Sequence, residues 1–354
     1  MGLLWMEYEE DFQNLVQKAF QCESNDNEEY FSKLTKKVQK IIYRDTRYNI
    51  DFLYTAYTLK DSKIMEKYAI WLYELMDAIL NKYQSINTVD YVIRHLGYIH
   101  QAVQLTIPKE KQDELLKLIE LGQESIKHYV QNKQKSLIQE SSYEREIQQY
   151  LDSLFKKDIK QSMSLIHQFK EQGISIVDIY VDILAESMRR IGEMWHKAQI
   201  TVDIEHYCTS TTQMAMSQMY PDIFSHKRKN KKIICACPGS ELHEMGARMV
   251  ADLFENDGWD SIYLGAAVPE DAMLEAISSY QPDLVALSVT MPQHLIDCKD
   301  LVMKIKQSFP QIKVAVGGNA FKSTHHMWSL WPVDLYSDNA RDFLLQAQLL
   351  FGDE

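Results

Sequence analysis

The chain has 354 residues, enough for two or three domains that each bury a hydrophobic core. Apolar residues make up 45% of it and charged residues 25%, an ordinary globular composition that argues against extensive disorder. The net charge of −12 argues against direct binding of nucleic acid. No apolar run is long enough to span a membrane and there is no signal-peptide pattern, so we expect no association with a membrane. Five widely spread cysteines, an odd number, fit a reducing compartment, so we expect a cytoplasmic protein.

Residues 1–131 are predicted to form a helical module, because Pro and Gly are scarce and apolar residues recur every three or four positions. The stretch from Leu96 to His100, followed by Leu105 to Pro108, resembles the proximal-histidine region of globin-like sensor domains. By this resemblance His100 would bind haem or another tetrapyrrole such as a bilin. A signalling or dimerisation module without a cofactor is the favoured alternative, because His95 and His100 alone do not define a haem site.

A polar connector and a second helical region follow. Residues 132–144 lack an apolar stripe, which indicates a connector. Beyond it the pattern predicts a four-helix bundle over 143–225. Its helices are expected at 143–156, 158–172, 175–197 and 202–219.

From Lys232 onward, short apolar runs alternate with amphipathic segments. This alternation predicts a parallel sheet covered by helices on both faces, a Rossmann-like (flavodoxin-like) domain over 229–354. The expected strands are 233–237, 261–267, 284–289, 314–316 and 333–336, with helices at 243–256, 270–280, 294–308 and 338–351. The basic run 227–232 before the first strand is more typical of a solvated linker than of a phosphate-binding strip.

The loop after the first predicted strand carries the first candidate site. Open α/β sheets bind ligands beyond the carboxyl ends of their strands, where the stretch from Pro238 to His243 lies. A histidine there can coordinate a metal if a carboxylate or hydroxyl orients its ring, and Glu241 and Ser288 are the candidates. Gly246, three residues past His243, permits close approach of a bulky group to the backbone.

Two further elements end the third and fourth predicted strands, Ser288-Val289-Thr290 and Gly317-Gly318. With the His243 loop they resemble the ordered elements of cobalamin-binding domains, which line the channel for the dimethylbenzimidazole tail. The resemblance implies that His243 binds cobalt from below. The other implied cofactor contacts are Glu241, Gly246, Ser288, Thr290, Gly317 and Gly318. The family often has Asp where this chain has Glu241.

The predicted turn between the third and fourth bundle helices is bracketed by Trp195-His196 and Glu205-His206. This spacing resembles the upper-face cap of cobalamin-dependent photoreceptors of the CarH/LitR type. The resemblance implies that Trp195 packs over the 5′-deoxyadenosyl group, that Glu205 hydrogen-bonds to it and that His206 shapes the same pocket. His196 matches the residue that becomes the upper cobalt ligand after illumination. Residues 1–131 depart from this family, whose familiar members carry a DNA-binding domain there.

The two resemblances together predict an adenosylcobalamin-binding light sensor that is not an enzyme. Photolysis of the cobalt–carbon bond would shift the bundle against the sheet domain and signal through the N-terminal module to an unknown protein partner. By resemblance we expect a homo-oligomer whose state depends on light. Methylcobalamin is the alternative cofactor, and a methyl-carrying corrinoid protein of a methyltransferase system is the alternative function. A mutase is less favoured because no (β/α)8 barrel precedes the domain, and a cobalamin chaperone is a further alternative.

Overall fold

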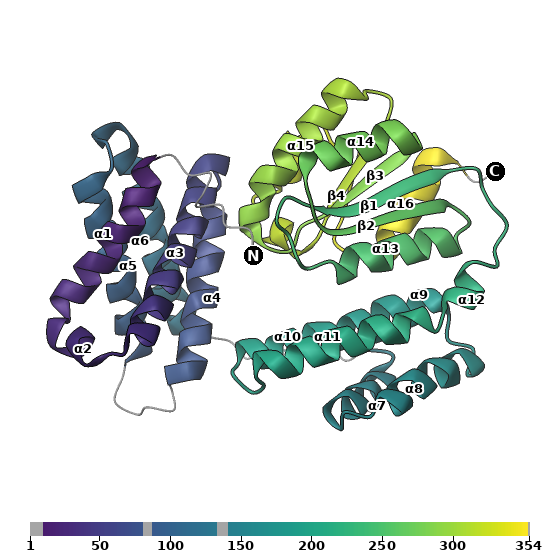
Figure 1. The fold of residues 1–354 in the computed structure, drawn as a ribbon, viewed down its shortest axis with the longest axis horizontal. Coiled ribbons are helices and arrows are strands. Elements are labelled where there is room, and N and C mark those ends of the chain that lie inside the picture. The colour runs from purple at the N-terminus through teal and green to yellow at the C-terminus, as the bar shows by residue number, and fades with distance from the viewer. Residues whose placement is uncertain (1–9, 81–86, 133–140, 353–354) are drawn as a thin grey trace. The chain divides into compact units, whose positions relative to one another are not determined.

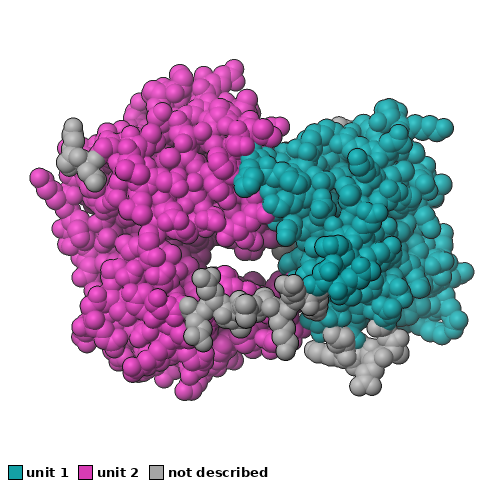
Figure 2. Space-filling model, turned by 180° about the vertical axis from the view of Figure 1, so that it is seen from behind, with its two compact units in different colours: residues 1–135, 323–327 teal, residues 136–322, 328–354 magenta. Residues whose placement is uncertain are grey.

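The structure is a computed structural model that describes residues 10–80, 87–132 and 141–352 (Figure 1). The chain forms two compact units, residues 1–135 with 323–327 and residues 136–322 with 328–354 (Figure 2). Most of the predicted connector 132–144 lies outside the described residues. Among the helices that the structure describes, none is long and apolar enough to cross a membrane.

The first unit is helical, as the sequence predicts. Its helices are α1 (Glu10–Asp26), α2 (Glu28–Lys33), α3 (Lys36–Leu59), α4 (Ser62–Leu80), α5 (Thr88–Thr106) and α6 (Lys109–Gln131). Asn87 begins α5, because its side chain accepts hydrogen bonds from the backbone N–H groups of Val89 and Asp90. Helices α4 and α6 pack closely at Gly122, where an added Cβ would lie 3.2 Å from Cβ of Ala69.

The second unit begins with helices that share one apolar core. They are α7 (Glu144–Phe155), α8 (Ile159–Glu171), α9 (Ile176–Asp178), η2 (Ile179–Leu184), α10 (Ala185–His196), α11 (Val202–Ser217) and the short α12 (Tyr220–Ile223). Because α9, η2 and α10 follow one another directly, residues 176–196 form one long helix with a π-helical turn inside it. Tyr150, Phe169 and Ile191 are fully buried in the shared core, which also takes in Met249 and Leu253 from the sheet domain.

The sheet domain has the parallel order that the alternating pattern predicts. Its strands are β1 (Lys232–Pro238), β2 (Asp260–Val268), β3 (Leu284–Ser288), β4 (Lys313–Gly317) and β5 (Leu335–Ser337), in the order β2-β1-β3-β4-β5. All four neighbouring pairs are parallel. Helices α14 (Glu270–Tyr280) and α15 (Leu295–Ser308) cover one face, and α13 (Met245–Asn256) and α16 (Ala340–Phe351) cover the other (Figure 1). The Rossmann-like parallel fold is therefore confirmed.

The basic run before β1 folds onto acidic partners of the sheet domain. Arg228 pairs with Glu255, and Lys229 Nζ lies 2.9 Å from Asp257 Oδ2. Lys231 Nζ lies 3.8 Å from an oxygen of Asp283. These pairs use much of the positive charge within the fold, which favours the linker interpretation over a phosphate-binding strip.

Candidate functional site

The site lies where the order of the strands reverses. Strand β1 is flanked by β2 on one side and β3 on the other, so the chain leaves β1 and β3 toward opposite sides of the sheet. Such a switch point opens a crevice at the carboxyl ends of the strands. The β1–α13 loop, the end of β3 and the end of β4 meet there.

Glu241 is the buried anchor of this crevice. Its side chain is fully buried, and its Oε2 accepts hydrogen bonds from the backbone N–H groups of Thr290 (2.9 Å) and Met291 (2.8 Å). Its Oε1 accepts a hydrogen bond from His243 N (2.9 Å) and lies 2.6 Å from His243 Nδ1. One carboxylate therefore ties the β1–α13 loop to the loop after β3 and sets the orientation of the imidazole.

His243 presents its other ring nitrogen outward. Its side chain is 56% exposed, and because Nδ1 faces Glu241, Nε2 is the nitrogen left to bind a metal. Of the two sequence candidates for orienting the ring, the structure thus selects Glu241. The hydrogen bond that His243 Nδ1–H donates to Glu241 raises the pKa of His243, against the opposing effect of burial. Burial raises the pKa of Glu241, but its bonds to His243 and to Met291 N–H outweigh this and bring it to about 2.

Thr290 contributes to the site through its backbone N–H group, whereas Ser288 has its hydroxyl beside Gly246. A Cβ added to Gly246 would meet only Ser288 Oγ, at 3.8 Å, so the fold itself does not require glycine there. Gly317 and Gly318 differ: added Cβ atoms would lie 2.5 Å from Ser337 O and 2.3 Å from Val289 O. These two glycines are needed for close backbone packing, while Gly246 leaves space open.

That space belongs to a cavity of about 310 Å³ in the second unit. Gly246, Ser288, Gly317 and Gly318 line it near the strand ends. Its remaining walls come from the middles of β1, β3 and β4, from α13 and α16, from residues 337–339, and from η2 and α10.

The four residues of the predicted cap lie at one end of the helical layer. Trp195 and His196 end α10, both half-buried, and Glu205 and His206 lie in the first turns of α11. Glu205 accepts a hydrogen bond from Thr209 Oγ1 (2.9 Å), and its Oε2 lies 2.7 Å from Nδ1 of the exposed His206.

One face of α11 looks toward the His243 loop. Glu205, Thr209 and Gln213 are spaced by four residues and so share a helix face. Gln213 Nε2 donates a hydrogen bond to Glu244 Oε1 (3.1 Å), next to His243 in the chain. After the larger effects of Glu241 and burial, the charge of Glu205 also raises the pKa of His243. Gln213 was not among the site residues predicted from the sequence, although its spacing from Glu205 places both residues on one face of a helix.

The comparisons with known proteins agree with this geometry. Residues 231–335 match the family model described as a B12 binding domain, and residues 146–220 match a second model with the same description. The chain carries a cobalamin-binding module. Together the two matched segments cover the sheet domain from β1 to the start of β5 and most of the helical layer that packs on it.

Individual relatives are distant. The chain is 27% identical over 151 residues to the HTH-type transcriptional repressor CarA of Myxococcus xanthus, a match that covers 42% of this chain but only 49% of the repressor. It is 20% identical to trimethylamine corrinoid protein 1 of Methanosarcina acetivorans, over 59% of this chain and 98% of that protein. The structure of the Methanosarcina barkeri monomethylamine corrinoid protein has a TM-score of 0.53 at 17% identity, over 59% of this chain and 100% of that one, which shows a shared fold.

The residues present fit a corrinoid. The module offers an imidazole with an outward Nε2, fixed by a buried carboxylate, beside a cavity that a glycine keeps open. His243 and Glu241 would hold the cobalt side, and the cavity would take the nucleotide tail.

The histidines of the N-terminal unit have different contacts from those of His243. His95 Nε2 lies 2.8 Å from Asn49 Nδ2, and its Nδ1 lies 3.3 Å from a carboxylate oxygen of Glu23. His100 Nε2 lies 3.6 Å from Glu120 Oε1. Both histidines have polar partners within the first unit, so these contacts lend no support to a haem or bilin site.

Proposed function

We propose that the protein is a cobalamin-dependent light sensor whose helical layer responds to the upper face of the cofactor. The hydrogen bond from Gln213 of α11 to Glu244 carries the proposal, because it joins the helix that bears Glu205 to the residue next to His243 in the chain. The Trp195-His196 and Glu205-His206 pattern supports a cap for an adenosyl group rather than an open upper face.

Bound adenosylcobalamin would supply a cobalt–carbon bond that visible light can break. The chain's own part is positional: Glu241 orients His243 below, while Trp195 and Glu205 cover the upper ligand. His196, directly after Trp195, would hold the upper face once the adenosyl group has left. A stimulus acts only through different stabilities of two states, so the sensor needs two arrangements of α10 and α11 against the sheet domain.

The output would pass through the N-terminal helical module to a protein partner, in a homo-oligomer whose state depends on light. This role involves no chemical turnover of a substrate, so we propose that the protein is not an enzyme.

A methyl-carrying corrinoid protein is the second candidate. It is favoured by the match to almost the full length of a trimethylamine corrinoid protein. Such a carrier needs an upper face that a methyltransferase can reach, and a tryptophan at the end of α10 suits that access poorly. The two candidates differ in whether light or a methyltransferase partner acts on the bound cofactor.

The deciding experiment is to load the full chain with adenosylcobalamin in darkness and record absorption spectra and size-exclusion profiles before and after green light. We expect the spectrum and the elution volume to change together. His196→Ala should bind the cofactor normally yet give a different illuminated spectrum. If the elution volume does not change with light and the illuminated spectra of wild type and variant are identical, the light-sensor proposal is contradicted. The methyl-carrier proposal then remains.

A further inference from the structure

The cavity beside the His243 loop is closed by residues from outside the sheet domain. Its sheet side is formed by Cys235, Ala286 and Ala315 in the middles of β1, β3 and β4, and Val250 of α13 and Phe343 of α16 flank it. The wall opposite these residues comes from η2 and the first turns of α10, and residues 337–339 also line the cavity. The residues of the η2 and α10 wall are Val181, Ala185, Glu186 and Arg189.

The π-helical turn that forms this wall is fastened to both flanking helices. Tyr180 Oη donates a hydrogen bond to Asp252 Oδ2 on α13 (2.8 Å). Arg341 of α16 donates to Asp182 Oδ2 (2.7 Å) and so holds the turn from the other side. Val181 lies between these two anchors in the chain and lines the cavity. π-Helical turns are rare and are frequently found at functional sites, so this one is a candidate for contact with a ligand in the cavity.

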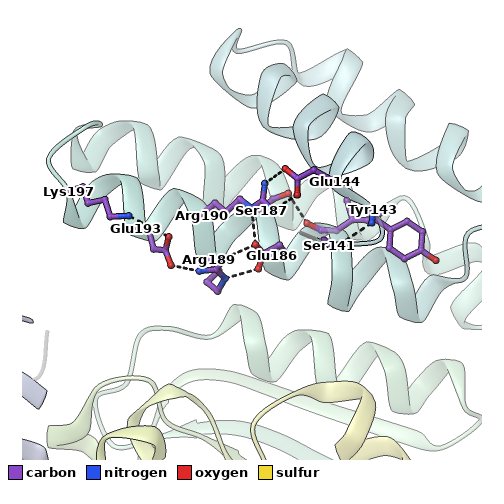
Figure 3. A network of polar contacts seen from close by, with 10 residues as sticks. Ser141, Tyr143, Glu144, Glu186, Ser187, Arg189, Arg190, Glu193 and Lys197 are labelled. Atoms are coloured by element: carbon purple, nitrogen blue, oxygen red, sulfur yellow. Dashed lines mark hydrogen bonds and ion pairs between the residues drawn. The ribbon is translucent and has the colours of Figure 1, made fainter. Parts of the chain in front are cut away.

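The cavity offers few polar groups to a ligand. Arg189 Nη2 donates a hydrogen bond to Glu186 Oε1 (2.6 Å), and Arg189 also pairs with Glu193, as the network in Figure 3 shows. The polar side chains that line the cavity at the end of β5 and between β5 and α16 also have partners. They are Ser337 with Asn339 O, Asp338 with Lys322 and Asn339 with Asp342. Among the described lining residues, Ser288 alone has a polar side chain for which the structure gives no partner.

We propose that η2 and the start of α10 select the lower base of the bound corrinoid, favouring a benzimidazole over a purine. The inference rests on the proposed cobalamin site, because a corrinoid held by His243 has released its own base from cobalt and must house its nucleotide tail. A purine base brings an exocyclic amine and extra ring nitrogens, which Val181 and Ala185 leave without hydrogen bonds, while Glu186 and Arg189 already pair with each other. A dimethylbenzimidazole brings methyl groups that pack against Val181 and Ala185 instead.

The test compares the affinities of the full chain for three probes: cobalamin, the cobamide with adenine as lower base, and cobinamide, which lacks the nucleotide tail. We expect the affinity of wild type for cobalamin to be at least about tenfold higher than its affinity for the adenine cobamide, because the purine would bury a polar group without a hydrogen bond. Equal affinities for these two probes would overturn the selection. Failure to bind all three would instead contradict the cobalamin site itself.

Two variants assign the selection to the helical wall. Ala185→Trp should fill the cavity and lower cobalamin affinity to the level of cobinamide, with cobinamide affinity unchanged. Val181→Thr, which keeps the side-chain shape but replaces a methyl group by a hydroxyl, should shift the preference severalfold toward the adenine base. The control is Val202→Trp, at a position 51% exposed on α11, which should leave all three affinities unchanged. If both wall variants bind the three probes with the affinities of wild type, the residues of η2 and α10 do not select the lower base.

Discussion

The two faces of the proposed cofactor site are built differently. Below, Glu241 is fully buried and its two oxygens bridge two loops of a rigid parallel sheet. Above, the cap residues lie at helix ends, and His206 is 73% exposed. The lower face is therefore organised before any ligand arrives, whereas the upper face has side chains that are more exposed to solvent than that of Glu241. A sensor needs this difference, since one face must hold the cofactor while the other rearranges.

The largest effect is expected on removing the lower ligand. His243→Ala should weaken cobalamin binding by about 100-fold or more, because even residues that only support a metal ligand contribute 10–100-fold. Equilibrium binding followed by absorbance measures it. His206→Ala, a histidine of the upper face, is the matched control and should change the affinity less than about threefold. Equal losses in both variants would remove the distinction between the faces.

Glu241→Ala should affect both binding and stability. It leaves the N–H groups of Thr290 and Met291 without their acceptor, at a cost of about 1–3 kcal/mol in the free energy of unfolding. Cobalamin affinity should also fall about 10–100-fold, because the imidazole loses its orientation. Urea denaturation and binding titrations measure the two effects. A variant as stable as wild type would show that the carboxylate does not brace the loops.

The pH dependence of the lower face has two opposite branches. The pKa of Glu241 is lowered to about 2 in the folded protein. Its contribution to stability is therefore fully present above its unfolded pKa of about 4.3 and is lost as pH falls from there through the folded pKa. The pKa of His243 is raised, so stability from the protonated ring is complete below its unfolded value of about 6.5 and is lost as pH rises through the folded pKa.

Cobalt and a proton compete for Nε2, so cobalamin affinity should increase with pH through the raised pKa of His243. Binding titrations across this range check the sign. In Glu241→Gln the increase should move to lower pH, because the negative charge that raises the histidine pKa is removed. An affinity independent of pH in wild type would argue against His243 as the ligand.

The smallest effect on affinity is expected at the cap. Trp195→Ala should weaken adenosylcobalamin binding about tenfold, through lost contact with the adenosyl group, and leave hydroxocobalamin binding within about twofold. The aromatic control is Tyr280→Ala, 47% exposed on α14. Equal losses for both cobalamins would mean that Trp195 does not distinguish the upper ligands.

The periodicity of the sequence was sufficient to locate most of the fold. The β1–α13 loop follows a buried apolar run, so the position of His243 at a strand end was predictable from the chain. The four helical stretches after the connector were expected within two residues of their observed ends. These features depend on local patterns that a single sequence carries.

The wall of the cavity was not predictable in this way. Val181 looks like any apolar position of an amphipathic helix, and its role follows from Tyr180 and Asp182 reaching partners about 70 and 160 residues away. The role of Thr290 was likewise hidden, because the group that matters is its backbone N–H. The globin-like expectation for His100 rested on a short resemblance, and its contact with Glu120 offers it no support.

The most direct test of the account is whether the imidazole of His243 binds cobalt. Protein made with ¹⁵N-labelled histidine would be loaded with cobalamin in the cobalt(II) state and studied by electron paramagnetic resonance. The account predicts that the nitrogen splitting changes from the triplet of ¹⁴N to the doublet of ¹⁵N, and that His243→Ala abolishes this change. A triplet that persists in labelled wild-type protein would mean that the cofactor's own base remains on cobalt, contradicting the account.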